Sequence, residues 1–300
     1  MMSLKYTVPH NKQIRVIIDT DAACEADDPF AIVQALLSPK LVVQGIVAAH
    51  FNEPGSTKRS FDEIKTILRL LNNNIPVFMG EEGPISERSS DTKLSPACEF
   101  IIRESLKEDE RPLFILCQGA ITNVAVAFMQ NPQIIKKSTV VWIGTHGAGN
   151  VKATFREYNA GNDIEAANFV LTSGADIWLI PSFVYSTVNI GIAEIQRRIA
   201  PCGSIGRHLF ENLVDYNMSD KAGWTKGESW SLGDSPAVGV ALNDWCGKYH
   251  EVSAPHIEED TSSHEVEGNP IIREYTSIDS RYILEDLIAK LELCKQDDAI

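Results

Sequence analysis

Short apolar runs alternate with amphipathic segments through the first 180 residues, and no other feature of the chain constrains its fold as strongly. The amphipathic segments repeat their apolar residues every three or four positions, which is the period of a helix. Strands are predicted over 14–18, 41–49, 75–79, 113–117, 139–143 and 176–180, and helices over 29–37, 60–71, 97–106, 124–129 and 164–171. Repeated strand–helix–strand units predict an α/β fold with a mostly parallel, Rossmann-like central sheet flanked by helices.

The last third of the chain changes character. Helical patterns dominate over 192–199, 205–216 and 236–245, and a strand over 271–278 with a helix over 281–293 follows. No break in composition marks a linker, so we predict one domain over 1–300, with a core over about 14–245 and extra helices in the C-terminal third.

Charge and composition exclude several classes of protein. The net charge is −14, which argues against a nucleic-acid partner because such binding needs clustered cations. No apolar run approaches the roughly 18 residues of a membrane span, and the polar N-terminus resembles no signal peptide. The six cysteines form no Cys-x-x-Cys pair, which is typical of free thiols in a reducing compartment. We therefore expect a cytoplasmic protein with no membrane partner.

Five carboxylates lie within ten residues after the first predicted strand, namely Asp19, Asp21, Glu25, Asp27 and Asp28. Like charges crowded at one strand end repel each other, and burial makes their ionisation costlier. A divalent cation would relieve this repulsion, and an all-carboxylate site favours Ca²⁺ or Mg²⁺ over zinc. The alternative is that Asp27 and Asp28 only cap the helix that follows.

Further polar residues follow the other predicted strands. In open α/β sheets, ligands bind beyond the carboxyl ends of the strands, so these residues are candidates for the same site. They are His50 and Asn52, Gln118 to Asn123, His146 and Asn150, Glu157 and Asn159, and Asp234, which precedes a helix led by Pro236.

Together these segments resemble the nucleoside hydrolases of the inosine-uridine preferring type. The matching motifs occur in the order in which the family has them. They are Asp19-Thr20-Asp21 with Asp27-Asp28-Pro29-Phe30-Ala31-Ile32, the strand that leads to Asn52, Gly119-Ala120-Ile121-Thr122-Asn123, Gly149-Asn150, Glu157-Tyr158-Asn159, Asp163-Ile164-Glu165-Ala166-Ala167 and Gly233-Asp234-Ser235-Pro236-Ala237. The resemblance runs from about residue 14 to residue 245.

The resemblance implies a Ca²⁺-dependent hydrolysis of the N-glycosidic bond of ribonucleosides in nucleoside salvage, by a homodimer or homotetramer. The implied metal ligands are Asp21, Asp28, Asp234 and the backbone carbonyl of Gln118, with Asp21 also the general base for a Ca²⁺-bound water. The implied sugar-binding residues are Asp27, Asn52, Asn150, Glu157 and Asn159. Breaking this bond places positive charge on the ribose, which nearby carboxylates stabilise.

The chain departs from the family at two places. The loop between Asp21 and Asp27 has five residues where the family usually has three, and it carries the extra acid Glu25. Gly233 stands where many members have His or Trp, and the family's His-Gly-x-Asp-Gly segment is absent, so the usual groups that activate the leaving base are missing. Candidates for the base side are His146, Trp224 and Trp230, together with His50 and Tyr216.

Two rival functions stay open from the sequence. Asp19-Thr20-Asp21 after a strand also fits a phosphohydrolase of the haloacid-dehalogenase type, although that class explains neither Asp27 nor Asp28. A ribose- or nucleoside-binding protein without catalysis fits the missing leaving-group residues. A panel of nucleosides with a reducing-sugar readout separates these functions.

Overall fold

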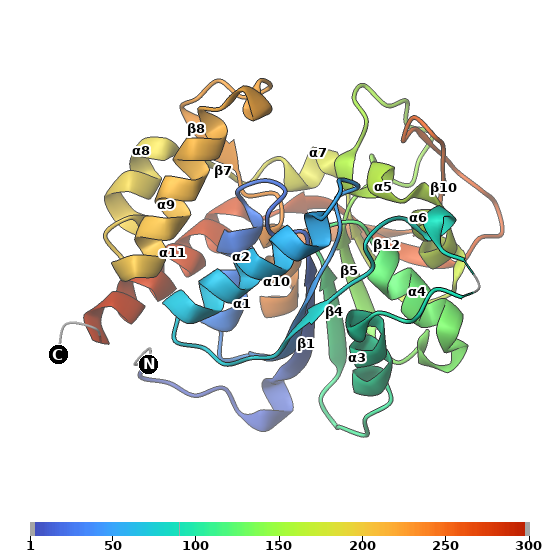
Figure 1. Cartoon of the computed structure of the whole chain (residues 1–300), viewed down its shortest axis with the longest axis horizontal. Coiled ribbons are helices and arrows are strands. Elements are labelled where there is room, and N and C mark those ends of the chain that lie inside the picture. Colours follow the sequence, from blue (N-terminus) through green and yellow to red (C-terminus); the bar gives the residue numbers. More distant parts are fainter. Residues whose placement is uncertain (1–3, 90, 298–300) are drawn as a thin grey trace.

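The computed structural model describes residues 4–89 and 91–297, and its centre is an eight-stranded sheet in the order β3-β2-β1-β4-β5-β6-β12-β9 (Figure 1). All neighbouring strands are parallel except β9, which pairs antiparallel with β12. The strands are β1 Ile14–Thr20, β2 Leu41–Ala48, β3 Val77–Met79, β4 Leu113–Cys117, β5 Thr139–Ile143, β6 Asp176–Ile180, β9 Gly247–Ser253 and β12 Ile271–Ile278. The predicted α/β class with a mostly parallel sheet is confirmed.

Helices cover both faces of the sheet, so its central strands are buried on both sides. In β1, Val16 and Ile18 pack into one apolar layer and Ile17 into the other, as the alternation of side chains along a strand requires. The first layer includes residues of α1 Asp28–Leu36, α2 Ser56–Leu70, α9 Gly203–Asn217, α10 Ser235–Leu242 and α11 Ser280–Asp297. The second includes residues of α3 Pro96–Ser105, α4 Thr122–Gln130 and α6 Ile164–Thr172.

Shorter elements connect these layers. They are η1 His10–Lys12, η2 Ile85–Glu87, η3 Pro132–Ile134, α5 Tyr158–Asn162, α7 Ser182–Tyr185, β7 Asn189–Gly191, α8 Ile192–Glu194, η4 Ile195–Ile199, η5 Asp220–Ala222, β8 Ser229–Ser231, β10 His256–Ile257 and β11 Ser263–His264. Both α5 and α7 lie at the top of Figure 1, above the upper ends of β4 and β5.

The predicted elements differ from the observed ones mainly in the C-terminal third. β9 was not predicted, because this edge strand is largely exposed and alternates charged and polar residues without an apolar face. The helix predicted over 192–199 is α8 followed by a turn of π-helix over Ile195–Ile199. The helix predicted over 236–245 ends at Leu242. None of the described helices combines the length and the apolar character that a membrane crossing needs.

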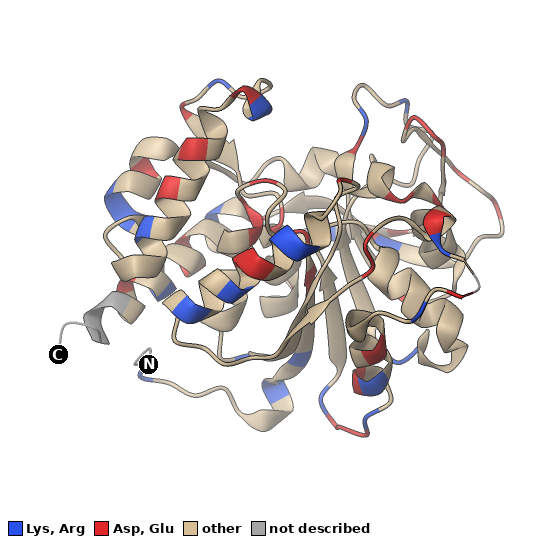
Figure 2. Ribbon diagram, in the orientation of Figure 1, with Lys and Arg blue, Asp and Glu red and all other residues tan. Residues whose placement is uncertain are grey.

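The parallel arrangement determines where the site forms. β2, β1, β4, β5 and β6 all run in the same direction, so their carboxyl ends meet at one edge of the sheet. The loop between β1 and α1 leaves this edge near the centre of the molecule, and Figure 2 shows acidic residues on it.

Candidate active site

The end of β1 directs two polar side chains to opposite faces of the sheet. The Thr20 hydroxyl faces α1 and donates a hydrogen bond to Oδ1 of Asp28. On the other face, Oδ1 of Asp19 accepts a hydrogen bond of 2.9 Å from Nδ2 of Asn123, at the start of α4. Burial raises the pKa of Asp19 to about 7, against the opposing effect of the Asn123 hydrogen bond. Asp19 therefore connects β1 to α4, away from the cavity.

Three carboxylates from two distant parts of the chain meet at the N-termini of two helices. Asp27 and Asp28 begin α1, and Asp234 precedes α10, each followed by a proline in the first helical turn. One carboxylate oxygen from each of the three lies within 4.8 Å of the other two, and all three residues are buried. α1 and α10 also pack against each other, so packing of the core brings Asp234 to Asp27 and Asp28.

Burial and mutual repulsion make this cluster costly to ionise. Burial is the main cause that raises the pKa of Asp21, Asp27 and Asp234 well above the usual value, and the neighbouring carboxylates add to it. Burial raises the pKa of Asp28 to about 6, while hydrogen bonds from Thr20 and other neighbours moderate the effect. The three acids at this distance, with Asp21 adding to their repulsion, need either protons or a cation between them.

Asp21 lies beside this cluster and approaches the backbone of the loop after β4. A Cβ on Gly119 would lie 2.7 Å from Oδ1 of Asp21, so glycine is needed for this approach. Within the described residues, Oδ2 of Asp21 and both side-chain polar atoms of Gln118 are buried without a hydrogen-bond partner. Unpartnered buried oxygens beside carboxylates form a donor set that fits a hard divalent cation.

The opposite side of the cavity is formed by the loop after β5 and by α5. Glu157 is fully buried and caps α5, its carboxylate accepting hydrogen bonds from the backbone of Thr145 (2.9 Å) and Ala160 (2.8 Å). The Tyr185 hydroxyl donates to the same carboxylate at 3.0 Å. Nδ2 of Asn159 donates to the carbonyl of Ile143 at 2.9 Å. These bonds fix Glu157 and Asn159 against the ends of the strands.

The cavity between these two sides brings together most of the residues predicted for the site. It is lined by Asp21, Cys24, Glu25, Asp27, Asp28, Gln118, Ile143, Glu157, Tyr158, Asn159, Tyr185, Gly233 and Asp234. Glu25, the extra acid of the longer loop, is among them, and burial raises its pKa to about 7 with added repulsion from Asp28 and Glu157. The longer loop therefore places Glu25 in the lining of the cavity.

Asn52 and Asn150, also predicted for the sugar side, do not line the cavity. Asn52 is exposed and has a φ of 53°. Asn150 is exposed, and its side-chain oxygen accepts a hydrogen bond of 3.3 Å from the backbone of Glu265. Their contacts with a sugar remain predictions.

The candidates for the base side also lie outside the lining. His146 is buried, and its ring nitrogens pair with the Ser182 hydroxyl at 2.8 Å and the Phe155 carbonyl at 3.0 Å. Tyr216, Trp224 and Trp230 pack against one another, with Trp230 buried and Trp224 exposed. The structure thus gives these side chains packing contacts and shows none of them in the cavity.

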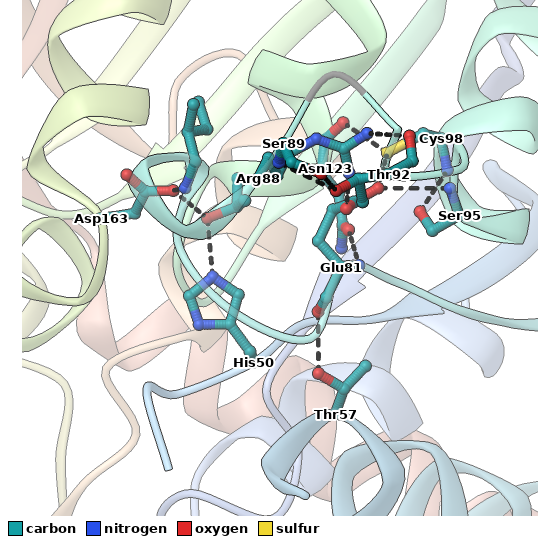
Figure 3. Close-up of polar contacts among 12 residues, drawn as sticks. His50, Thr57, Glu81, Arg88, Ser89, Thr92, Ser95, Cys98, Asn123 and Asp163 are labelled. Atoms are coloured by element: carbon teal, nitrogen blue, oxygen red, sulfur yellow. Dashed lines mark hydrogen bonds and ion pairs between the residues drawn. The ribbon is translucent and has the colours of Figure 1, made fainter. Parts of the chain in front are cut away.

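His50 belongs to a buried polar chain behind the site (Figure 3). Its Nδ1 accepts a hydrogen bond from the backbone of Asn52, so Nε2 donates to the Thr122 hydroxyl, 2.8 Å away. The Thr122 hydroxyl in turn donates to Asp163 at 2.7 Å. Burial lowers the pKa of His50 to about 4, which keeps the ring neutral and suits it to this structural role.

A second network in Figure 3 centres on Glu81, in the loop after β3. Its carboxylate pairs with Arg88 and accepts hydrogen bonds from the backbone of Ser95 and the thiol of Cys98. Its backbone N–H donates to the side chain of Asn123 at 2.9 Å, and Asn123 also holds Asp19. The network links this loop to the buried acid at the end of β1.

Three polar residues of the lining were not assigned to the site from the sequence. Tyr158 stands between two predicted residues in the Glu157-Tyr158-Asn159 motif. Tyr185 follows β6 closely, so the rule that strand ends carry ligands would have found it. Cys24 has no such signal, because it lies in the middle of the loop after β1 and follows no strand directly.

The fold and the cavity define a class of protein, namely an α/β enzyme with a buried acidic centre at the carboxyl edge of a parallel sheet. Residues 16–282 match the model of the inosine-uridine preferring nucleoside hydrolase family. The chain belongs to this family and is an enzyme that hydrolyses the N-glycosidic bond of ribonucleosides.

Known relatives agree in sequence and in fold. The pyrimidine-specific ribonucleoside hydrolase RihA of Salmonella schwarzengrund is 27% identical over 255 residues, which cover 77% of each chain. A RihA of Escherichia coli O1:K1 / APEC is 27% identical over 257 residues, again 77% of each. The purine-preferring ribonucleoside hydrolase of Gardnerella vaginalis superposes with a TM-score of 0.78 at 19% identity, over 94% of this chain and 99% of that one. The plant nucleoside hydrolase PpNRh1 superposes with a TM-score of 0.77 at 21% identity, over 93% of this chain and 99% of that one.

Proposed function

We propose that this enzyme is a Ca²⁺-dependent ribonucleoside hydrolase in which Asp21 activates the attacking water. The observation that carries the proposal is the position of Asp234, whose carboxylate lies within 4.8 Å of those of Asp27 and Asp28 although it is distant in sequence. Buried carboxylates at this distance need protons or a cation between them, and a divalent cation is the one that an all-oxygen donor set favours.

The proposed ligands are the carboxylates of Asp21, Asp28 and Asp234 and the backbone carbonyl of Gln118. The set fits a hard cation, because every donor is oxygen and Asp21 has a buried oxygen without a partner among the described residues. When bound, such an ion would lower the pKa of a nearby water and offset the negative charge of the cluster.

The remaining steps follow from the chain's own side chains. Asp21 accepts the proton of the attacking water, and Asp27, at the same end of the cavity, accepts a hydrogen bond from a ribose hydroxyl. Glu157 and Asn159 hold the opposite side of the sugar, where strand ends and α5 fix them. The acids on both sides favour the positive charge that develops on the ribose as its bond to the base breaks.

Release of reducing sugar from a panel of purine and pyrimidine ribosides tests this proposal. We expect release with Ca²⁺, loss of release in EDTA, and recovery when Ca²⁺ is added back. A 2′-deoxyribonucleoside serves as the matched control and should react far more slowly, because it leaves a buried acceptor without its hydroxyl. Tight Ca²⁺-dependent binding without any release of sugar would instead indicate the non-catalytic nucleoside-binding function.

A further inference from the structure

Two buried threonines hold a backbone conformation that threonine rarely adopts. Among the described residues other than glycine, four have a positive φ, and two of these are the exposed asparagines Asn52 and Asn72, a residue type that tolerates the left-handed region. The other two are Thr145, with a φ of 64°, and Thr261, with a φ of 67°, and both are fully buried. A β-branched side chain crowds the backbone in this region, so both positions are strained. Strain of this kind is concentrated at functional sites.

Both threonines bond to the same residue, Glu157, which the proposed function places against the sugar. From one side, the backbone N–H of Thr145 donates to Oε2 of Glu157 at 2.9 Å. From the other side, the Thr261 hydroxyl accepts a hydrogen bond of 2.8 Å from the backbone N–H of Glu157. Glu157 is therefore held through its side chain and its backbone at once. Two strained positions that meet at one residue of the cavity indicate that the strain serves this contact.

Further hydrogen bonds fix the direction in which each threonine faces Glu157. The Thr261 hydroxyl donates its own proton to the carbonyl of Asp260 at 2.6 Å, which leaves its oxygen free to accept the Glu157 N–H. The carbonyl of Thr145 accepts a bond of 3.0 Å from the backbone of Ser182, at the start of α7. Neither threonine can turn away from Glu157 without the loss of a second hydrogen bond.

The hairpin of β10 and β11 carries Thr261 and is bonded to the loop that leads to α5. Val151 and Ser263 exchange two backbone hydrogen bonds of 2.9 Å. The Ser262 hydroxyl accepts a further bond of 2.9 Å from the backbone of Ala153. In Figure 1, β10 lies close to α5. A segment beyond the predicted core of residues 14–245 thereby supports the sugar side of the cavity.

Building on the proposed function, we infer that Thr261 is a positioning residue of the active site. It is not among the described residues that line the cavity, so it acts through Glu157 and not on the sugar itself. Together with Thr145 on the other side, it fixes Glu157 before a substrate binds, so binding does not have to order this carboxylate. The alternative is that Thr261 only closes its hairpin, in which case its hydroxyl would affect stability and not the rate.

Removal of the hydroxyl tests this role. Thr261→Val keeps the shape of the side chain and leaves the Glu157 N–H without its acceptor. For the ribonucleoside that the unchanged enzyme cleaves best, we expect kcat/KM to fall about tenfold, because a small displacement of a group that holds the substrate lowers the rate by this order. Thr261→Ser restores the hydroxyl and should restore kcat/KM. Thr139→Val is the matched control and should not change kcat/KM, because the Thr139 hydroxyl bonds to Asp176 at 2.6 Å at the opposite edge of the sheet.

A double variant separates positioning from support of the fold. Glu157→Gln should itself lower kcat/KM, and Thr261→Val should then lower it by less than about twofold more, because two residues that act through one contact are not additive. A full additional loss in the Glu157→Gln protein would overturn the inference. An unimpaired Thr261→Val enzyme beside an impaired Glu157→Gln enzyme would also overturn it and leave the proposed function intact. Failure of the unchanged enzyme to release sugar from any riboside would overturn the proposed function itself.

Discussion

Replacement of Gly119 by alanine tests the position of Asp21 without touching any ionisable group. The added Cβ would lie 2.7 Å from Oδ1, 2.8 Å from Cγ and 3.1 Å from Cβ of Asp21. Carbon and oxygen atoms that are not bonded approach each other to about 3.3–3.5 Å. Gly119 is not among the residues with positive φ, so alanine adds no backbone strain there. Asp21 must therefore move by a large fraction of an ångström.

The expected loss follows from this displacement. A misplacement of about 1 Å at a reacting centre commonly costs about 10²-fold in rate, so we expect kcat/KM of Gly119→Ala to fall about 10²-fold. That fall corresponds to about 2.7 kcal/mol in the activation free energy. Crowding of the buried loop should also lower stability by about 1–3 kcal/mol, measured as the free energy of unfolding in urea. Release of ribose under saturating Ca²⁺ gives the kinetic value.

Gly191→Ala is the matched control. A Cβ at Gly191 would have as its nearest neighbour only the carbonyl oxygen of Glu228, 4.0 Å away, so alanine fits there at no steric cost. We expect its kinetics and stability to equal those of the unchanged chain. Full activity of a folded Gly119→Ala protein would refute the assignment of Asp21 to the reacting centre.

Three further predictions rest on other contacts. Asp21→Ala should lower kcat by about 10²–10⁴-fold, as loss of a positioned base does, while ribose still competes for the site, and unchanged initial rates would remove Asp21 as the base. EDTA-treated protein should melt at a lower temperature at pH 8 than at pH 5. Burial raises the pKa of Asp28 to about 6 and of Asp19 to about 7, above the values these groups have in the unfolded chain. The free energy of unfolding therefore falls as the pH rises through these values and the buried side chains ionise. A melting temperature that did not change between these pH values in circular dichroism would contradict this. Glu104→Ala should cost about 1–3 kcal/mol in urea unfolding, because it removes the buried carboxylate that pairs with Arg15 at 3.1 Å and leaves that guanidinium only the 3.7 Å ion pair with Asp109 and its backbone partners, and kcat at 25 °C should stay the same.

The fold could be predicted wherever burial on both faces makes a strand apolar throughout. β1, β4 and β5 read as apolar runs because helices cover both of their faces. β9 could not be found in this way. It lies at the edge of the sheet, and its Lys248, His250 and Glu251 are exposed side chains that leave no apolar period. Its pairing with β12 is a long-range contact that local sequence does not encode.

The acidic side of the cavity could be predicted because strand ends and helix starts fix it. Asp21 follows β1 directly, while Asp28 and Asp234 stand at the starts of helices, one and two residues before a proline. The base side of the cavity could not be predicted, because its candidates were chosen by residue type and not by their position at a strand end or helix start. Trp230 is buried for packing and His146 holds a loop, which are the commoner uses of such side chains.

The same helices that place the acids also help the chain to fold around them. The N-termini of α1 and α10 carry the positive ends of two helix dipoles and lie next to the cluster, so they offset part of the repulsion between Asp28 and Asp234. α10 is buried along nearly its whole length and packs on α1, which holds both termini in place by apolar contacts. The geometry of the acids is thus set by the core before any ion arrives. An ion that binds such a preformed site gains affinity, because little of the chain has to be ordered when it binds.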